Sequence, residues 1–255
     1  HRAEWIAGVG GGSVLDLAKA CAGLFRAGRP PADYHRGTPV EAPALPFAAV
    51  PATAGTGAEA TPNAVLIDRA ARRKASLRAD DWIARLVILD PRLPALCPRP
   101  VIAFAGLDAL TQALEAYISR QATAASDALA LEALRLIGAN LEPLYRGPGE
   151  EAADGLLVGS YLAGLAFAMA RLGVVHGLAH PLGVRFGLPH GHLCGACLPH
   201  AVALNRKAMG AKYAAAGTAL GGDLLEKLRG LLGRLDVAPP LRGIPIEDRE
   251  AIAAE

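Results

Sequence analysis

Short apolar runs, each followed by glycine or proline, dominate the first hundred residues of the chain. The run Trp5–Val9 is typical of a strand and leads directly into the glycine-rich segment Gly10–Ser13. Apolar residues then recur at helical spacing from Leu15 to Phe25, which predicts a helix. A strand, a glycine turn and a helix in this order are typical of an α/β fold.

Three more apolar runs in this part of the chain are expected to form strands. Phe47–Val50 precedes a second glycine-containing turn, and Ala64–Ile67 and Leu86–Leu89 follow that turn. All three runs are short and continuously apolar, as buried parallel strands are. We therefore expect them to join a buried parallel sheet.

The pattern changes near Pro98–Pro100, beyond which alanine and leucine recur at helical spacing and no strand-like run is found. The sequence thus predicts an α/β domain over residues 1–100 and an all-helical domain over residues 101–255. The segment Arg146–Gly149 is predicted to be a loop between two helices. The expected helices are Ala105–Arg120, Ser126–Leu141, Ala152–Leu172, His190–Asn205 and Leu224–Leu235.

The overall composition excludes several classes of protein. With 26 basic and 24 acidic residues, the net charge of +2 is too small to recruit nucleic acid or an anionic membrane. A hydrophobic content of 52% excludes intrinsic disorder, and four cysteines are too few for a disulfide-built secreted scaffold. The uncharged, largely apolar stretch Gly155–Ala170 is shorter than the roughly 20 apolar residues of a membrane span. We therefore expect it to be a buried helix of a soluble, cytoplasmic protein.

Both glycine turns follow a predicted strand and are suited to bind phosphate. In Gly10–Ser13 the missing side chains let backbone amides approach an anion, and the next helix points its positive dipole end at the same place. The turn Thr53–Gly57 has similar chemistry. Neither matches the GxGxxG fingerprint or the P-loop pattern, and each alone fits an ordinary tight turn equally well. Together they favour a crevice for an extended phosphate-bearing ligand such as a dinucleotide.

Polar residues recur on one face of an otherwise apolar helix in the second half of the chain. Asp108, Gln112, Glu115 and Ser119 are spaced by four, three and four residues. This stripe fits either a solvent-facing surface or a buried face that lines a site. In the second case Asp108 and Gln112, which are one helical turn apart, both present oxygen atoms to a metal.

Five of the seven histidines lie between His176 and His200. Imidazole is a common ligand of zinc and iron, but an HxxxH pair such as His176 and His180 is a weak motif that interior histidines also produce. We expect Pro181 to end or bend the helix that carries this pair, and His190 to open the next helix. The HExxH motif of zinc proteases is absent.

Cys194 and Cys197 form a CxxC pair inside an apolar helical segment. No second CxxC is present to complete a zinc ribbon, and the pair does not stand at the exposed start of a helix after a strand. We therefore interpret both as small core residues rather than as a redox pair.

Five segments in this order resemble the iron-containing (group III) alcohol dehydrogenases. They are GGGSVLDLAKA at 10–20, PATAGTGAEATPNAVLID at 51–68, DPRL at 90–93, GLDALTQALEAYIS at 106–119 and VHGLAHPLGVRFGLPHG at 175–191. Together they are far more specific than any one alone. The resemblance implies a Rossmann-like N-terminal nucleotide-binding domain followed by an all-helical metal-binding domain, with NAD or NADP and a divalent metal as cofactors.

The resemblance also assigns roles to residues of this chain. Asp108, His176 and His190 match metal ligands, and His180 matches a histidine beside the substrate that relays a proton. The predicted cofactor-binding residues are Gly11, Gly12, Ser13, Asp16, Thr53, Gly55, Thr56, Asn63 and Lys74.

Gln112 departs from the family pattern, because iron-dependent members carry a histidine ligand at this position. An amide oxygen is a weaker and harder donor than imidazole. Gln112 either binds the metal through its oxygen or leaves an Asp-His-His site with an open position, which is a normal arrangement for catalytic zinc. The expected metal is therefore Fe(II) or Zn(II).

The activity implied by the resemblance is hydride transfer between a nicotinamide and a small alcohol, which is interconverted with its aldehyde or ketone. Alternatives are a metal-independent reductase of the maleylacetate reductase type and a sugar-phosphate cyclase of the dehydroquinate synthase type. A pseudoenzyme or assembly fragment is the non-enzymatic alternative, which Gln112 motivates. Family members are commonly dimers or larger, so we expect a homodimer or a larger homo-oligomer.

The chain is short at both ends when compared with the family. Members carry further β–α units before the GGGS turn and a helical tail after the position of Glu255. We therefore expect the nucleotide-binding domain to be incomplete here. The residue that distinguishes NAD from NADP in such folds is expected to precede His1.

Overall fold

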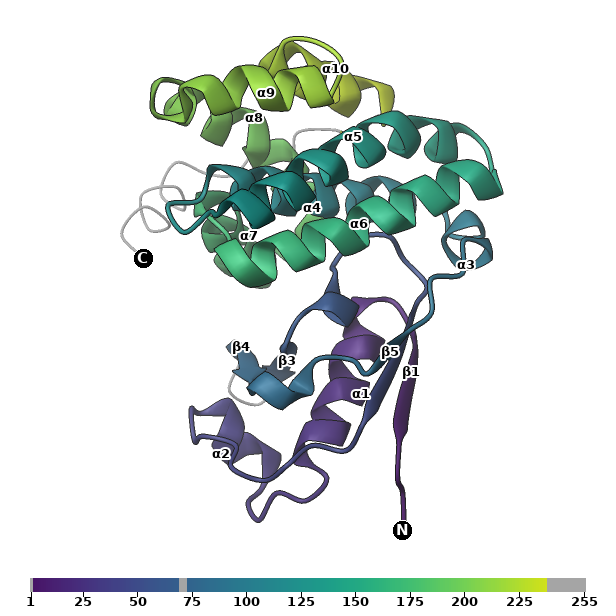
Figure 1. Cartoon of the computed structure of the whole chain (residues 1–255), viewed down its shortest axis with the longest axis vertical. Coiled ribbons are helices and arrows are strands. Elements are labelled where there is room, and N and C mark those ends of the chain that lie inside the picture. Colours follow the sequence, from purple (N-terminus) through teal and green to yellow (C-terminus); the bar gives the residue numbers. More distant parts are fainter. Residues whose placement is uncertain (1, 69–72, 238–255) are drawn as a thin grey trace.

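The computed structural model describes residues 2–68 and 73–237, apart from the side chains of Arg73 and Lys74. A small α/β part carries a bundle of longer helices, which occupies the upper half of Figure 1. The elements are β1 (Ile6–Gly10), α1 (Gly12–Leu24), α2 (Pro31–His35), β2 (Phe47–Pro51), the 3-10 turn η1 (Ala58–Ala60), β3 (Asn63–Asp68), β4 (Arg73–Arg78), the 3-10 turn η2 (Asp80–Trp82), β5 (Leu86–Val87), α3 (Arg92–Ala95), α4 (Arg99–Ile118), α5 (Ala124–Arg146), α6 (Glu150–Ala170), α7 (Val174–Phe186), α8 (His190–Met209), α9 (Ala211–Ala219) and α10 (Leu224–Arg234).

Three strands form a parallel sheet in the order β1-β2-β5. Helix α1 packs against this sheet and buries Leu15 with Phe47 and Ala49. The register places Gly10 opposite Pro51, so the two glycine turns leave neighbouring strands at the same edge of the sheet. The α/β fold with a following helical part is confirmed, and its topology brings the two turns together.

Two of the strand predictions need correction. Ala64–Ile67 lies in β3, which pairs antiparallel with β4 in a separate hairpin rather than joining the parallel sheet. Ile67 is 64% exposed, so this apolar run is not buried on both faces as a parallel strand would be. Leu86–Leu89 joins the parallel sheet only through Leu86 and Val87. Leu86 is 49% exposed because β5 forms one edge of the described sheet.

Helix α4 is the central helix of the bundle and packs against α5, α6 and α8. Every residue from Gly106 to Tyr117 is buried, which explains why the helix is apolar on nearly all sides. Helices α4 and α6 are both long and apolar enough to cross a membrane by composition alone. Both belong to the main hydrophobic core of the bundle, and 78% and 44% of their most apolar segments are buried within it. Both helices therefore contribute to the core of the bundle.

All five expected helices are present, and the predicted loop Arg146–Gly149 separates α5 from α6. Pro181 does not end its helix, because α7 continues through this residue to Phe186. Pro181 removes the hydrogen bond to the carbonyl of Gly177, but both residues are exposed, so water can hydrate that carbonyl. Helix α8 begins at His190 as predicted.

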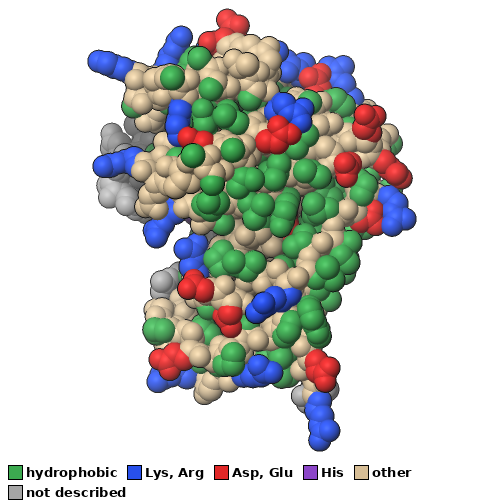
Figure 2. Space-filling model, viewed as in Figure 1, with side chains coloured by type: hydrophobic (Ala, Val, Ile, Leu, Met, Phe, Trp, Pro, Cys, Tyr) green, Lys and Arg blue, Asp and Glu red, His purple; other side chains and the backbone are tan. Residues whose placement is uncertain are grey.

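The flank of the α/β part that carries β1 exposes hydrophobic side chains. Figure 2 shows such side chains along this flank and over the junction with the helices. Trp5 and Val9 next to or within β1 are 54% and 61% exposed, and Val14 of α1 is 46% exposed. Within residues 2–68 and 73–237, β1 is an edge strand, and this face is left uncovered.

Candidate active site

A cluster of potential metal ligands lies in the middle of the helical bundle. Asp108 of α4, His176 of α7 and His190 and Cys194 of α8 each offer one donor atom, and all four atoms lie within 4.8 Å of one another. His176 Nε2 lies 3.1 Å and His190 Nε2 3.7 Å from Asp108 Oδ1. The carboxylate and the two imidazoles predicted from the sequence are therefore brought together from three helices.

The close approach of α8 to α4 depends on a glycine. A Cβ atom on Gly191 would lie 1.9 Å from the carbonyl oxygen of Phe104, so only glycine allows this contact. The contact places His190 beside Asp108. It also allows the ring of His192 to stack on that of Phe104, with 4.8 Å between the ring centroids. His192 thus has a packing role, distinct from the ligand cluster.

Glu115 holds His176 from the side opposite Asp108. Its Oε2 atom lies 2.6 Å from His176 Nδ1, and its Oε1 accepts a hydrogen bond from the backbone N–H of Val175 at 2.7 Å. Asp108, Gln112 and Glu115 are all at most 4% exposed, so the polar stripe on α4 is a buried face that lines the site. A carboxylate that binds the outer nitrogen of a histidine ligand fixes its ring orientation and raises its basicity.

Burial and hydrogen bonding shift the pKa values of this cluster in opposite directions. Burial disfavours the charged form of His176, but its bonds to Asp108, Cys194 and Glu115 outweigh this and raise its pKa well above the usual value. Burial of Asp108 acts to raise its pKa, but the bond to His176 and the charges nearby lower it. Burial and the neighbouring Asp108 raise the pKa of the Cys194 thiol to about 12. The group is thus built to stabilise positive charge beside Asp108.

His180 lies at the more open side of this cluster. Its ring stacks on that of His190 with 4.8 Å between centroids, whereas 6.5 Å separates it from the ring of His176. The side chain of His190 is 27% exposed and that of His176 only 6%. The cluster is therefore more exposed on the side of His190 than on the side of His176.

The two glycine turns touch each other at the edge of the sheet. A Cβ on Gly12 would lie 2.6 Å from the side chain of Thr56, and one on Gly11 would lie 3.3 Å from that of Thr53. Gly11 caps α1 and has no side chain to occupy the amides of its first turn. The turns therefore form one cradle at a helix N-terminus, where an anion is favoured.

The second turn also contacts the metal-ligand helix. A Cβ on Gly55 would lie 2.8 Å from Cβ of Ala105 in α4. The amide nitrogen of Gln112 donates to the carbonyl oxygen of Thr56 at 3.4 Å, while its Oε1 is buried without a hydrogen-bond partner among the described residues. Gln112 thus connects the predicted metal site to the phosphate cradle.

Lys19 anchors the segment after the second turn and was not anticipated as a site residue. Its Nζ atom donates to the carbonyl oxygens of Ala58, Thr61 and Asn63, with the last two at 2.7 and 2.9 Å. Burial lowers the pKa of Lys19 to about 8, although the nearby carboxylates of Asp16 and Glu59 act to raise it. Its position three residues after Asp16, on the apolar face of the predicted helix, is the sequence signal that could have revealed it.

The remaining predicted cofactor-binding residues lie at different distances from the cradle. Asp16 is buried beside Lys19, whereas Ser13 is exposed at the start of α1. Asn63 begins β3, and its side-chain oxygen is buried without a hydrogen-bond partner among the described residues. Lys74 belongs to β4, but its side chain lies outside the described part of the structure.

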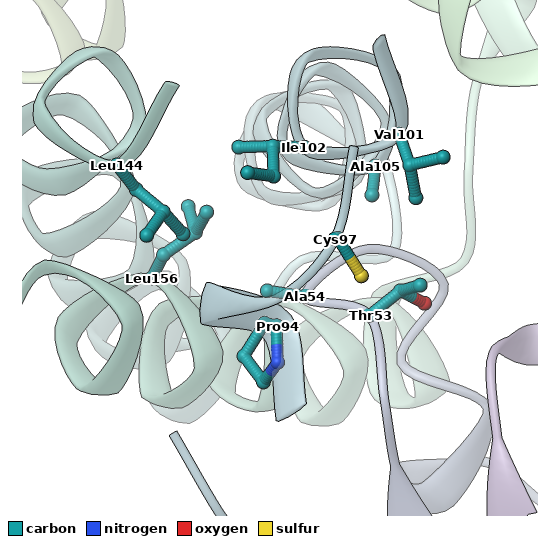
Figure 3. A pocket seen from close by; sticks show the side chains of 9 residues that line it. All are labelled: Thr53, Ala54, Pro94, Cys97, Val101, Ile102, Ala105, Leu144 and Leu156. Carbon is teal, nitrogen blue, oxygen red and sulfur yellow. The ribbon is translucent and has the colours of Figure 1, made fainter. Parts of the chain in front are cut away.

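A small cavity lies where the second turn meets the helices. Figure 3 shows Thr53 and Ala54 from the turn, Cys97 and Pro94 from the segment before α4, and side chains of α4 to α6 around it. Its volume of about 10 Å³ admits at most one water molecule. The cavity is therefore a packing gap at the junction and not a ligand site.

Comparisons with known proteins show the family to which the chain belongs. Residues 1–91 match the family model "Iron-containing alcohol dehydrogenase", and residues 102–255 match "Fe-containing alcohol dehydrogenase family, C-terminal". The chain is 35% identical to the sulfoacetaldehyde reductase of Bilophila wadsworthia and to the lactaldehyde reductase of Escherichia coli, over 98% of its length and 69% and 70% of theirs. It is 40% identical to long-chain-alcohol dehydrogenase 1 of Geobacillus thermodenitrificans, over 86% of its length and 56% of that protein.

Solved structures give the same result. The fold matches the crystal structure of sulfoacetaldehyde reductase from Bifidobacterium kashiwanohense in complex with NAD⁺ with a TM-score of 0.94 and 29% identity, over 98% of this chain and 69% of that one. It matches a 1,3-propanediol oxidoreductase with a TM-score of 0.93 and 31% identity, over 99% of this chain and 70% of that one. The chain thus spans 56–70% of these relatives. It belongs to the iron-containing alcohol dehydrogenase family, whose members are metal-binding, NAD(P)-linked oxidoreductases acting on alcohols and aldehydes.

Proposed function

We propose that this chain carries the metal site and part of the cofactor site of an NAD(P)-linked oxidoreductase that interconverts a small alcohol with its aldehyde or ketone. The observation that carries this proposal is the contact between two sites on α4. The cluster of Asp108, His176 and His190 lies one helical turn from Gln112, which binds the phosphate cradle through Thr56. A ligand held in that cradle is thereby kept close to the metal ligands.

The donor set fits a divalent metal. One carboxylate and two imidazoles, with a thiol beside them, converge from three helices, and Asp108 and His176 are buried. Nitrogen and oxygen donors of this kind suit both Fe(II) and Zn(II). When bound, the metal supplies a Lewis acid that lowers the pKa of the substrate hydroxyl. This donor set supports the metal-dependent reaction over the metal-independent alternative.

The chain's own residues prepare the reaction around that metal. Glu115 fixes the ring of His176, so that Nε2 faces Asp108. The backbone amides at Gly11 and Gly12 bind the cofactor phosphates, and the nicotinamide accepts or gives the hydride. NAD⁺ in the structure of the sulfoacetaldehyde reductase supports NAD as the cofactor. Asn63, with its unpaired buried oxygen, orients the polar part of the bound cofactor or substrate.

His180 carries the proton between the substrate hydroxyl and solvent. It stacks on His190 at the exposed side of the cluster, and imidazole exchanges protons readily near neutral pH. In the oxidation direction His180 takes up the hydroxyl proton, and in the reduction direction it returns one to the carbonyl oxygen. A cytoplasmic homo-oligomer remains a prediction from the sequence.

The test combines metal analysis with a turnover screen. The protein, loaded with Fe(II) or Zn(II), is assayed with NAD(H) and NADP(H) against small alcohols and aldehydes. His176→Ala is expected to lose both the bound metal and turnover, whereas His200→Ala, which alters an exposed histidine of α8, keeps both. Full turnover by metal-stripped His176→Ala protein would overturn the metal-dependent proposal.

A further inference from the structure

Cys194 points into the predicted metal site although the sequence suggests a simple core residue. Its side chain is fully buried, and its Sγ atom lies 3.6 Å from His190 Nε2 and 3.9 Å from His176 Nε2. It stands four residues after His190 on α8, so both side chains leave the helix on the same face. Its sulfur also lies within 4.8 Å of the donor oxygen of Asp108.

Four donor–donor distances in the cluster are close to those around a single metal ion, and all donor atoms lie within 4.8 Å of one another. In a tetrahedral zinc site with metal–ligand distances of about 2.0 Å for nitrogen or oxygen and about 2.3 Å for sulfur, the donors lie roughly 3.3–3.6 Å from one another. Here Asp108 Oδ1 lies 3.1 Å from His176 Nε2 and 3.7 Å from His190 Nε2. Cys194 Sγ lies 3.9 Å from His176 Nε2 and 3.6 Å from His190 Nε2. Small shifts of the side chains are enough to close the four donors around one ion.

Gln112 leaves the place for a fourth ligand open. Its amide group is bound to the carbonyl of Thr56 through Nε2, so it is turned at least partly toward the cofactor turn. Among the described histidine, cysteine, aspartate and glutamate residues, the cluster of close metal donors contains Cys194 and does not contain Cys197. Cys194 of α8 therefore adds a fourth donor to the three ligands predicted from the sequence.

We propose that Cys194 is the fourth protein ligand, which gives an Asp-His-His-Cys site selective for zinc over iron. The proposal rests on the metal site proposed above and specifies its chemistry. On coordination the thiol proton passes to solvent and the sulfur binds as thiolate. Thiolate is a soft donor and favours Zn(II) over harder ions, so it compensates for the imidazole that position 112 lacks. A zinc ion held by these four residues would still have room for a substrate oxygen, because zinc can expand its coordination to five ligands.

The test uses Co(II) in place of zinc, because a cysteine thiolate bound to Co(II) gives an intense near-ultraviolet charge-transfer band. Metal-free protein is titrated with Co(II) and its absorption is recorded. Wild-type protein is expected to show the band at one equivalent of Co(II). Cys194→Ser is expected to lose it, and Cys197→Ser, which changes a partly buried cysteine of the same helix, is expected to keep it.

The affinity for Zn(II) is a second measurement, made by competition with a chromophoric chelator. Mutation of a residue that only hydrogen-bonds to a metal ligand typically weakens metal binding about 10–100-fold. Cys194→Ser removes a ligand itself, so its affinity for Zn(II) is expected to fall by at least this factor, whereas Cys197→Ser is expected to keep the wild-type affinity. If Co(II) binds to wild-type protein without the charge-transfer band, Cys194 is not a ligand and the metal site still stands. If Co(II) does not bind at all, the metal site itself is refuted. Far-ultraviolet circular dichroism of each metal-free variant verifies that the variant is folded. The charge-transfer band of Co(II)-loaded wild-type protein tests the proposal even if a variant does not fold.

Discussion

Glu115 and His176 form the shortest of the described contacts to an imidazole in the predicted metal site, with 2.6 Å between Oε2 and Nδ1. This contact fixes which nitrogen of His176 faces Asp108 and keeps the ring from turning. The carboxylate therefore acts on the metal through the histidine, without belonging to the cluster of donors itself.

Removal of this support is expected to weaken metal binding. Glu115→Ala should lower the affinity for Zn(II) about 10–100-fold, because the outer nitrogen of His176 loses its partner. Glu115→Gln, whose amide oxygen can still accept from Nδ1–H, should recover part of the loss. Competition with a chelator measures these affinities, and Glu132→Ala on the exposed face of α5 is the control. Equal affinities of Glu115→Ala and wild-type protein would contradict the assigned role.

The glycine at the contact between α8 and α4 is expected to be essential for stability. Gly191→Ala would place a methyl group 1.9 Å from the carbonyl oxygen of Phe104, so the two helices must separate. We expect the free energy of unfolding to fall by about 1–3 kcal/mol or more, as for other overpacked sites. Gly177→Ala is the matched control on α7, since a Cβ there meets open space. Chemical denaturation gives both values, and an unchanged stability of Gly191→Ala would refute this account of the packing.

A methyl group in the phosphate cradle is expected to weaken cofactor binding. A Cβ on Gly12 would lie 2.6 Å from the side chain of Thr56, so the second turn must move away from the start of α1. An overpacking penalty of about 1–3 kcal/mol corresponds to roughly a tenfold or larger loss of affinity for NAD(H). Fluorescence titration with NADH measures this loss. Gly28→Ala, at an exposed turn with no atom near the added Cβ, should bind as wild type does.

The buried Lys19 is expected to make stability depend on pH above neutrality. Its pKa is about 8 in the folded protein and 10.5 for an ordinary lysine, because burial disfavours the ammonium. Between these values the unfolded chain binds more protons at this position than the folded chain does. The contribution of Lys19 to the free energy of unfolding therefore rises with pH over this window, by up to about 1.4 kcal/mol per pH unit.

Subtraction of two stability curves isolates this effect from other titrations. The difference in unfolding free energy between wild type and Lys19→Met should increase by about 2–3 kcal/mol from pH 8 to pH 10.5, as the folded and unfolded pKa values require. Asp16 and Glu59 face Lys19, and both variants retain them. The same subtraction for Lys227→Met, at an exposed position of α10, should stay flat. A flat difference for Lys19 would show that burial does not disfavour its charge.

Much of the site could be predicted from the sequence because local signals and topology pointed the same way. The strand before Gly10 and the strand before Pro51 are neighbours, so two turns far apart in sequence meet as a parallel sheet requires. His176 and His190 were identified through the resemblance, and the structure brings both to Asp108.

The remaining features depend on which way a side chain points within the core. Cys194 and Lys19 have the spacing of ordinary buried helix residues, and only the packing of α8 on α4 and of α1 on the η1 segment gives them polar partners. Pattern alone also could not show that β3 pairs with β4, since a short apolar run has the same composition in a hairpin as in a parallel sheet.

Gly57 and Gly164 join the two parts of the molecule with no side chain between them. Gly57 adopts a left-handed backbone with φ of 58°, and a Cβ there would lie 2.7 Å from Cα of Gly164 in α6. Because neither residue has a side chain, no change of rotamer can accommodate a displacement at this contact. A tilt of the bundle relative to the sheet is therefore transmitted mechanically to the turn that ends at Gly57. The position of the second turn relative to α6 is therefore fixed at this pair by backbone contact alone.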